Sequence, residues 1–173
     1  MKNYLINLKK FVSTSRYNKP HGILLLFYPC LWGLSLSNQN ILEVYYLCIF
    51  FFLGACGMRA IGCIWNDLSD KKYDILVKRT KKRLIATGEV TKSNALIFMF
   101  VNFSLGVLPL FFISKFSIIL CIIVVPLVIS YPFMKRITWW PQLWLGINFN
   151  WGVLVGYYAL EEVSLNFPIL LFL

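Results

Sequence analysis

Charged residues divide the chain into long apolar stretches. Residues 20–42, 93–114, 116–134 and 137–160 contain no Asp, Glu, Lys or Arg, and residues 44–65 contain only Arg59. Each stretch is as long, or nearly as long, as the roughly 20 residues that a transmembrane helix needs. The pattern predicts five membrane-spanning helices, at about residues 21–37, 43–66, 94–113, 116–132 and 141–160. A last apolar run, FPILLFL at 167–173, is interpreted as the start of a sixth.

Composition supports an all-α integral membrane helix bundle that forms a single transmembrane domain over residues 1–173. The 173-residue chain is 59% hydrophobic and 14% charged, whereas soluble domains are roughly one-quarter charged. Within the N-terminal segment 1–19, residues 3–13 mix Leu5 and Leu8 with Lys9 and Lys10. This mixture favours a short helix that lies in the membrane interface.

The basic residues predict the orientation in the membrane. Five Lys and Arg residues precede the first predicted helix, eight lie between the second and third, and Lys135 and Arg136 lie between the fourth and fifth. The opposite side offers only Lys115. By the positive-inside rule, the N-terminus and the loop that follows the second helix face the cytoplasm. Because topology accounts for the net charge of +10, no nucleic acid is expected as a partner.

The second apolar stretch ends in an acidic motif. Asn66, Asp70 and Asp74 are four residues apart, and Asp67 stands three residues before Asp70. On a helix this spacing stacks side chains on one face, where like charges oppose each other and need compensation. One interpretation is a solvated face on which nearby Lys and Arg pair with the carboxylates. The other is a metal site, because oxygen donors without His or Cys suit Mg²⁺, which completes its shell with water and substrate phosphates.

Several basic residues are candidates for binding an anionic substrate. Lys78, Arg79 and Arg83 follow the acidic motif and are placed to meet phosphates. Arg59 lies two helical turns before Asn66 on nearly the same face, deeper in the membrane. An arginine there either snorkels or pairs with a helix backbone, or it binds an anionic substrate group. Arg16 and Arg136 close helix ends on the same side of the membrane, where either also suits topology alone. Lys135 is interpreted as a topology residue. Tyr131 is one of several aromatic residues that either pack or face a carbocation.

Four stretches resemble the UbiA superfamily of intramembrane prenyltransferases. They are RYNKPHGILLLFYPCLWGL at 16–34, MRAIGCIWNDLSDKKYDILVKRTKKR at 58–83, ATGEVTKSNAL at 86–96 and YPFMKRITWWPQLWLG at 131–146. The NDxxDxxxD pattern is typical of the superfamily. YPFMKR followed by Pro-Gln is similar to its 4-hydroxybenzoate polyprenyltransferase branch. The chain departs from the family at residues 83–85, where Arg-Leu-Ile replaces the usual Arg-Pro-Leu.

The resemblance implies a nine-helix bundle in which two Asp-rich motifs hold Mg²⁺ and a polyprenyl diphosphate. The first motif corresponds to four residues with a catalytic role, Asn66, Asp67, Asp70 and Asp74, of which Asn66, Asp70 and Asp74 are expected metal ligands. Arg136 matches a basic position that helps to hold an anionic group, and Arg59 matches an arginine of the cavity. The second motif belongs to the family's sixth helix, so the sequence is interpreted as an N-terminal fragment, expected to be inactive alone.

The implied reaction transfers the polyprenyl group to the ring carbon ortho to the hydroxyl of 4-hydroxybenzoate, in ubiquinone biosynthesis. The resemblance implies a location in the bacterial cell inner membrane, with membrane lipid as the surroundings, and it points to no particular protein partner. The alternatives are a UbiA-type enzyme with another aromatic acceptor, a cation channel or transporter, and a non-catalytic membrane fragment. A channel would place carboxylates in several helices, whereas here they gather in one region.

Overall fold

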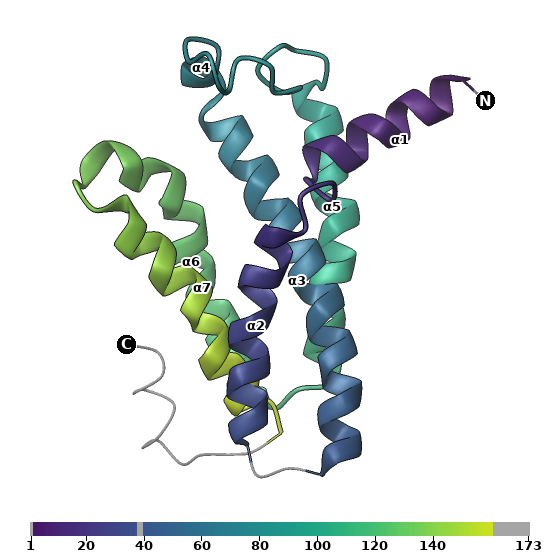
Figure 1. The fold of residues 1–173 in the computed structure, drawn as a ribbon, viewed down its shortest axis with the longest axis vertical. Helices are drawn as coiled ribbons and strands as arrows, with labels where there is room; N and C mark the ends of the chain where they lie inside the picture. Colours follow the sequence, from purple (N-terminus) through teal and green to yellow (C-terminus); the bar gives the residue numbers. More distant parts are fainter. Residues whose placement is uncertain (1, 38–39, 161–173) are drawn as a thin grey trace.

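A computed structural model describes residues 2–37 and 40–160 of the chain, and the side chains from residue 6 onward (Figure 1). The helices are α1 (Lys2–Thr14), α2 (His21–Leu36), α3 (Ile41–Ser69), α4 (Lys71–Asp74), α5 (Lys92–Val107), the 3₁₀ helix η1 (Leu108–Phe111), α6 (Lys115–Ile137) and α7 (Pro141–Tyr157). The described ranges contain no strand, which confirms the all-α fold. The predicted sixth helix lies outside them.

All five predicted apolar helices form, but some end at different residues. α3 continues to Ser69, so that Asn66 and Asp67 belong to the helix. The predicted end of the fourth helix at residue 132 is wrong, because α6 includes Pro126 and Pro132 and runs on to Ile137. Prolines are tolerated inside membrane helices where neighbouring groups satisfy the freed backbone. As a result, Lys135 and Arg136 stand on the last turn of α6 rather than in a loop.

Three helices are long and apolar enough to cross a membrane: Ile41–Ser69, Lys92–Phe111 and Lys115–Ile137. The second of these joins α5 to η1. α2 and α7 have 16 and 17 residues, which at 1.5 Å per residue gives lengths of about 24–26 Å. These lengths are slightly below the roughly 30 Å of a bilayer's hydrocarbon core. The helices therefore form a membrane bundle in which two members are short.

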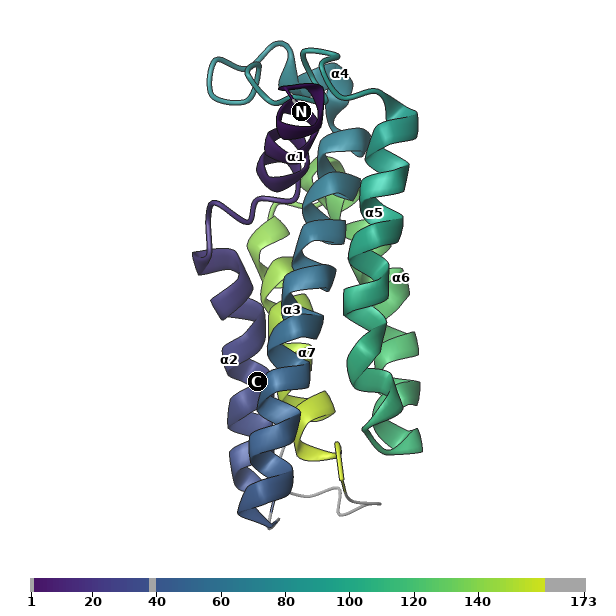
Figure 2. The ribbon, with the colours of Figure 1, turned by 90° about the vertical axis from the view of Figure 1, so that its right-hand side faces the viewer.

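Consecutive helices pack side by side, and so do helices that are distant in the sequence (Figures 1 and 2). α2 packs against both α7 and α3, α3 packs against α5, and α6 packs against α7. Leu34 of α2, Leu47 and Phe51 of α3 and Val155 of α7 share one buried core. α1 does not join the bundle but crosses the end at which α4 lies. The chain thereby gathers α1, α4 and the loop after α4 at one end of the molecule.

The contact between α2 and α7 depends on glycine. Gly33 of α2 lies against the backbone of Val153, and Gly152 and Gly156 of α7 lie against Cys30. A Cβ at Gly156 would meet the Cys30 carbonyl oxygen and lie 2.9 Å from the carbonyl carbon. Small residues of this kind let two membrane helices approach closely and gain van der Waals contact.

We predict that Gly156→Ala destabilises the bundle whereas Gly146→Ala does not. Both glycines lie in α7, but a Cβ at Gly146 meets no atom within 4 Å. Overpacking costs about 1–3 kcal/mol, so Gly156→Ala should lower the apparent Tm by roughly 2–12 °C. Thermal unfolding of both variants in detergent, followed by size-exclusion chromatography, provides the measurement. Equal Tm values for the two variants would contradict the proposed backbone contact.

Candidate active site

The acidic motif lies where α3 ends. Asp70 caps the helix, and its backbone N–H donates to the Asn66 carbonyl at 2.9 Å. The short helix α4 follows and ends at Asp74. Because α3 stops at Ser69, the motif does not continue along one helix face as its spacing predicted. Its four polar side chains instead have two separate sets of partners.

Asp67 and Asp74 share the first set of partners, two arginines. Arg16 Nη2 lies 2.7 Å from Asp67 Oδ1, and Arg83 Nη1 lies 3.0 Å from the same oxygen and 2.7 Å from Asp74 Oδ2. The side chains of Asp67 and Asp74 are only 7% and 8% exposed. A carboxylate removed from water to this degree needs a close cationic partner. Arg83 bridges the two and joins the end of α3 to α4.

The loop that carries Arg83 is held by an apolar cluster. Ile85 and Val90 of the loop pack with Ile64 of α3 and Ala95 of α5, and all four are buried. Leu84, which stands where the resembling family has proline, packs against the same cluster. The loop is therefore anchored on α3 and α5 without the proline.

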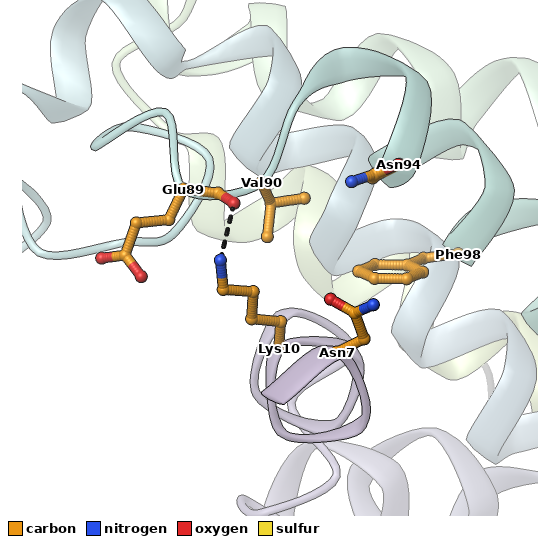
Figure 3. Close-up of a pocket in the computed structure, with 6 residues that line it drawn as sticks. All are labelled: Asn7, Lys10, Glu89, Val90, Asn94 and Phe98. Carbon is orange, nitrogen blue, oxygen red and sulfur yellow. Dashed lines mark hydrogen bonds between the residues drawn. The ribbon is translucent and has the colours of Figure 1, made fainter. Parts of the chain in front are cut away.

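A contact from α1 holds the far end of this loop. Lys10 Nζ donates to the Glu89 carbonyl at 3.1 Å, across a small pocket of about 150 Å³ that Asn7, Val90, Asn94 and Phe98 also line (Figure 3). None of the residues that line this pocket belongs to the acidic motif. Within the described residues, the Lys10–Glu89 contact joins α1 to the loop, and the pocket lies between α1, the loop and α5.

Asn66 and Asp70 share the second set of partners, two cations from α6. Lys135 Nζ donates to Asn66 Oδ1 and, at 3.1 Å, to Asp70 Oδ2. Arg136 Nη2 donates to Asp70 Oδ1 at 3.0 Å and to the Ser69 carbonyl at 3.1 Å. The Tyr131 ring centroid lies 5.0 Å from Lys135 Nζ. Lys135, interpreted from the sequence as a topology residue, is thus a member of the site, and its position beside Arg136 in YPFMKR is the signal that indicates it.

The oxygens of Asn66 and Asp70 fit a divalent cation. Both converge on one cationic atom, Lys135 Nζ. An amide oxygen and a carboxylate oxygen around one cation are donors that suit Mg²⁺, which keeps water or substrate oxygens as its other ligands. Within residues 2–37 and 40–160, no group of three or more His, Cys, Asp or Glu residues could hold a metal. Asp74 is engaged by Arg83. The roles of Asn66, Asp70 and Asp74 as metal ligands stay predictions.

A basic pocket of about 480 Å³ opens beside Asp67. Among the residues that line it are five cations and one carboxylate: Arg16, Lys19, Arg79, Lys82, Arg83 and Asp67. Three predicted substrate residues, Arg16, Arg79 and Arg83, therefore meet at one pocket. Cations in this excess favour an anionic ligand.

The remaining predicted substrate residues lie elsewhere. Lys78 is exposed and does not line the basic pocket. Arg59 lies earlier in α3 than Asn66, in contact with Gly22 of α2, and its guanidinium carbon is 5.7 Å from the Phe149 ring centroid. Tyr131 and Arg136 belong to the α6 side of the site. Most of the predicted residues thus form two groups around the end of α3, and Lys78 and Arg59 belong to neither.

Comparison with known families shows which family the chain belongs to. The UbiA prenyltransferase family matches residues 26–173. The chain belongs to this family. With its apolar helices, UbiA membership makes the chain an integral membrane protein.

Curated UbiA relatives are similar over most of the chain. The mitochondrial 4-hydroxybenzoate polyprenyltransferase of Drosophila melanogaster is 41% identical over 154 residues, which is 88% of this chain and 39% of that protein. The 4-hydroxybenzoate octaprenyltransferase of Hydrogenovibrio crunogenus is 40% identical over 155 residues, 90% of this chain and 54% of that protein. The chain thus spans about half or less of the length of these relatives.

A solved UbiA structure has the same fold. The apo structure of a UbiA homolog from Aeropyrum pernix K1 superposes with a TM-score of 0.68 and 23% sequence identity. It covers 87% of this chain and 54% of that chain. The helix arrangement described above is therefore a UbiA fold.

We predict that Arg83→Ala destabilises the UbiA bundle far more than Lys81→Ala. Loss of Arg83 leaves Asp74 without its ion pair and Asp67 with Arg16 alone, whereas Lys81 is exposed. Removing one partner of a buried pair costs about 3 kcal/mol, which corresponds to a Tm lower by roughly 6–12 °C. Thermal unfolding in detergent measures the difference, and adding Asp74→Asn to Arg83→Ala should restore part of it. Indistinguishable Tm values for the two single variants would refute the bridging role of Arg83.

Proposed function

We propose that this chain serves the transfer of a polyprenyl group from polyprenyl diphosphate to 4-hydroxybenzoate, a step of ubiquinone biosynthesis. The observation that carries the proposal is the convergence of Asn66 and Asp70 on one cation at the end of an apolar helix. A site of this kind suits a substrate with a metal-bound diphosphate and an apolar tail in the bilayer. Relatives at about 40% identity that carry this activity in their names support the choice of acceptor.

In this proposal Asn66 and Asp70 hold Mg²⁺. The ion supplies Lewis-acid stabilisation of the departing diphosphate. Lys135 and Arg136 now occupy the same oxygens, so they are placed to move from Asp70 to diphosphate oxygens when the substrate binds. Asp67 and Asp74 contribute by fixing Arg16 and Arg83.

The basic pocket beside Asp67 takes an anionic group. Arg16, Arg79 and Arg83 line it, and each presents a guanidinium, which suits both phosphate and carboxylate. The diphosphate and the carboxylate of 4-hydroxybenzoate are therefore both candidates for this pocket. If the pocket binds one of these two anions, the other needs different contacts. The candidates are Lys78, in the same loop, and Arg59, which precedes Asn66 in α3.

The reaction exchanges one bond for another at the first prenyl carbon. The bond from this carbon to the diphosphate oxygen breaks, and its electron pair leaves with the diphosphate. The ring carbon ortho to the hydroxyl then forms the new carbon–carbon bond and loses its proton, which restores aromaticity. Tyr131, whose ring lies beside Lys135, is placed to present a π face to the allylic cation. Apolar helices keep water away from this cation.

The acidic end of the bundle is proposed to face the cytoplasm, with the chain in a bacterial inner membrane. The loop after α4 and the last turn of α6 carry the basic residues that the positive-inside rule retains on that side. Lys115 at the start of α6 marks the opposite side.

Single cysteines at residues 78 and 115 test this orientation. In a variant whose five native cysteines are replaced by alanine, Lys115→Cys should react with a membrane-impermeant maleimide added to bacterial cells whose outer membrane has been permeabilised. Lys78→Cys should react only after the inner membrane is opened. Labelling of Lys78→Cys in cells with an intact inner membrane would reverse the proposed orientation.

Asp70→Ala tests the proposed chemistry. The chain is expressed as printed and also joined to the part of the Hydrogenovibrio crunogenus relative that follows the matched region, and membranes receive Mg²⁺, radiolabelled 4-hydroxybenzoate and octaprenyl diphosphate. Loss of a metal ligand should reduce prenyl transfer by more than roughly 100-fold, whereas Glu89→Ala, which keeps the carbonyl that Lys10 binds, should retain it. EDTA should abolish transfer and added Mg²⁺ should restore it. Undiminished product in EDTA would exclude the proposed metal-dependent departure of diphosphate.

A further inference from the structure

Arg16 stands at a backbone position that usually belongs to glycine. α1 ends in a Schellman motif: the Tyr17 N–H donates to the Val12 carbonyl at 3.1 Å, and the Arg16 N–H donates to the Ser13 carbonyl at 3.2 Å. Arg16 has a φ of 57° and is the only non-glycine residue of the described ranges with a positive φ. Glycine is favoured at this position because a Cβ makes the left-handed conformation costly.

The side chain of Arg16 explains why the position does not carry glycine. Its guanidinium reaches across to α3 and lies 2.7 Å from Asp67 Oδ1, at the edge of the basic pocket. Glycine at position 16 would adopt the left-handed conformation without strain, but it would remove the guanidinium that pairs with Asp67. A residue held in a disfavoured conformation indicates that the surroundings hold it there and that its placement serves the site.

The two residues that flank Arg16 bind one buried side chain, Asn102 of α5. Asn102 Nδ2 donates to Ser15 Oγ at 3.1 Å and to the Phe98 carbonyl at 2.6 Å, and Asn102 Oδ1 accepts from the Tyr17 hydroxyl. Asn102 is fully buried. Both of its N–H donors are used within the protein, and its oxygen already accepts a bond. The amide therefore acts on the protein's own chain.

The surroundings of Asn102 are closely packed. α3 and α5 approach closely at Gly57, which faces the Asn102 carbonyl and the Gly106 nitrogen. Phe11 of α1 packs edge-on against Phe98, with ring centroids 5.1 Å apart, and lies 6.0 Å from the Tyr17 ring.

The Tyr17 hydroxyl is a constant donor in this network. Burial, followed by the nearby Cys56 thiol, raises the pKa of Tyr17 above its usual value. The hydroxyl thus stays protonated at physiological pH and continues to donate to Asn102.

We propose that Asn102 is a positioning residue for the candidate active site. Through Ser15 and Tyr17 it holds Arg16 in the left-handed conformation and thereby fixes the guanidinium on Asp67. It touches no substrate. The hold on Arg16 is a property of the fold, whereas its consequence for an anionic substrate rests on the function proposed above.

A coupling measurement separates positioning from general stabilisation. Arg16→Ala, Asp67→Asn and the double variant are compared by thermal unfolding in detergent, first with Asn102 and then with Asn102→Leu. With Asn102, the shifts should be non-additive by about 2–6 °C, because the two residues form a direct pair. With Asn102→Leu, the non-additive part should fall to zero, since Arg16 is no longer held on Asp67.

The controls distinguish the outcomes. Ser104→Ala, on an exposed residue of α5 whose hydroxyl bonds within its own helix, should leave the coupling unchanged. If Asn102→Leu does not fold, Tyr17→Phe, which removes one hydroxyl from the network, takes its place. Coupling between Arg16 and Asp67 that persists in the variant background would overturn the proposal, even if the variant lowers Tm.

Binding of inorganic pyrophosphate with Mg²⁺, measured by calorimetry, tests the consequence for the site. Arg16→Gly and Asn102→Leu should both weaken binding about tenfold, although only the first removes the guanidinium. Loss of coupling with unchanged pyrophosphate affinity would keep Asn102 as a positioning residue and remove Arg16 from the substrate contacts. The failure of this proposal and the failure of the proposed function thus give different results.

Discussion

Pairing of the carboxylates at the end of α3 determines how the other elements meet there. Three aspartates lie at the border between apolar helix and water, and two of them are nearly buried. An unpaired charge in such a place costs several kcal/mol. The cations that compensate it come from the turn after α1, from the loop after α4 and from the end of α6. One local requirement therefore joins segments that are far apart in the sequence.

The break between α3 and α4 gives the two kinds of acidic residue different tasks. Asn66 and Asp70 face Lys135 and Arg136, whose side chains are about one-third exposed. Asp67 and Asp74 face arginines in a more enclosed setting. An exposed pair is weak and exchanges readily, whereas a buried pair resists disruption. The same short motif thus contains one carboxylate held by the more exposed cations of α6 and two held by more enclosed arginines.

The membrane helices could be predicted from the sequence because a bilayer excludes charge from a span of fixed length. Where helices end was less predictable: the fourth helix was expected to end at about residue 132, yet α6 continues through Pro132 to Ile137. The residue types of the site were predictable from NDxxDxxxD and YPFMKR. Its pairings were not, because Arg16 and Asp67 are 51 residues apart and nothing local links them. The sequence marks Asn102 only as a polar side chain in an apolar helix. Its partners on the turn after α1 could be identified only from the fold.

The excess of cations around the basic pocket also affects the rate at which ligands arrive. Its field extends into the surrounding water over about 8 Å at physiological ionic strength. An anion that diffuses within this distance is drawn toward the opening before it makes any contact, and added salt shortens the reach of that attraction. The same field attracts an anion dissolved in water and an anionic group anchored in the lipid. Arg79 and Lys82 line the pocket and add to the positive charge at its opening.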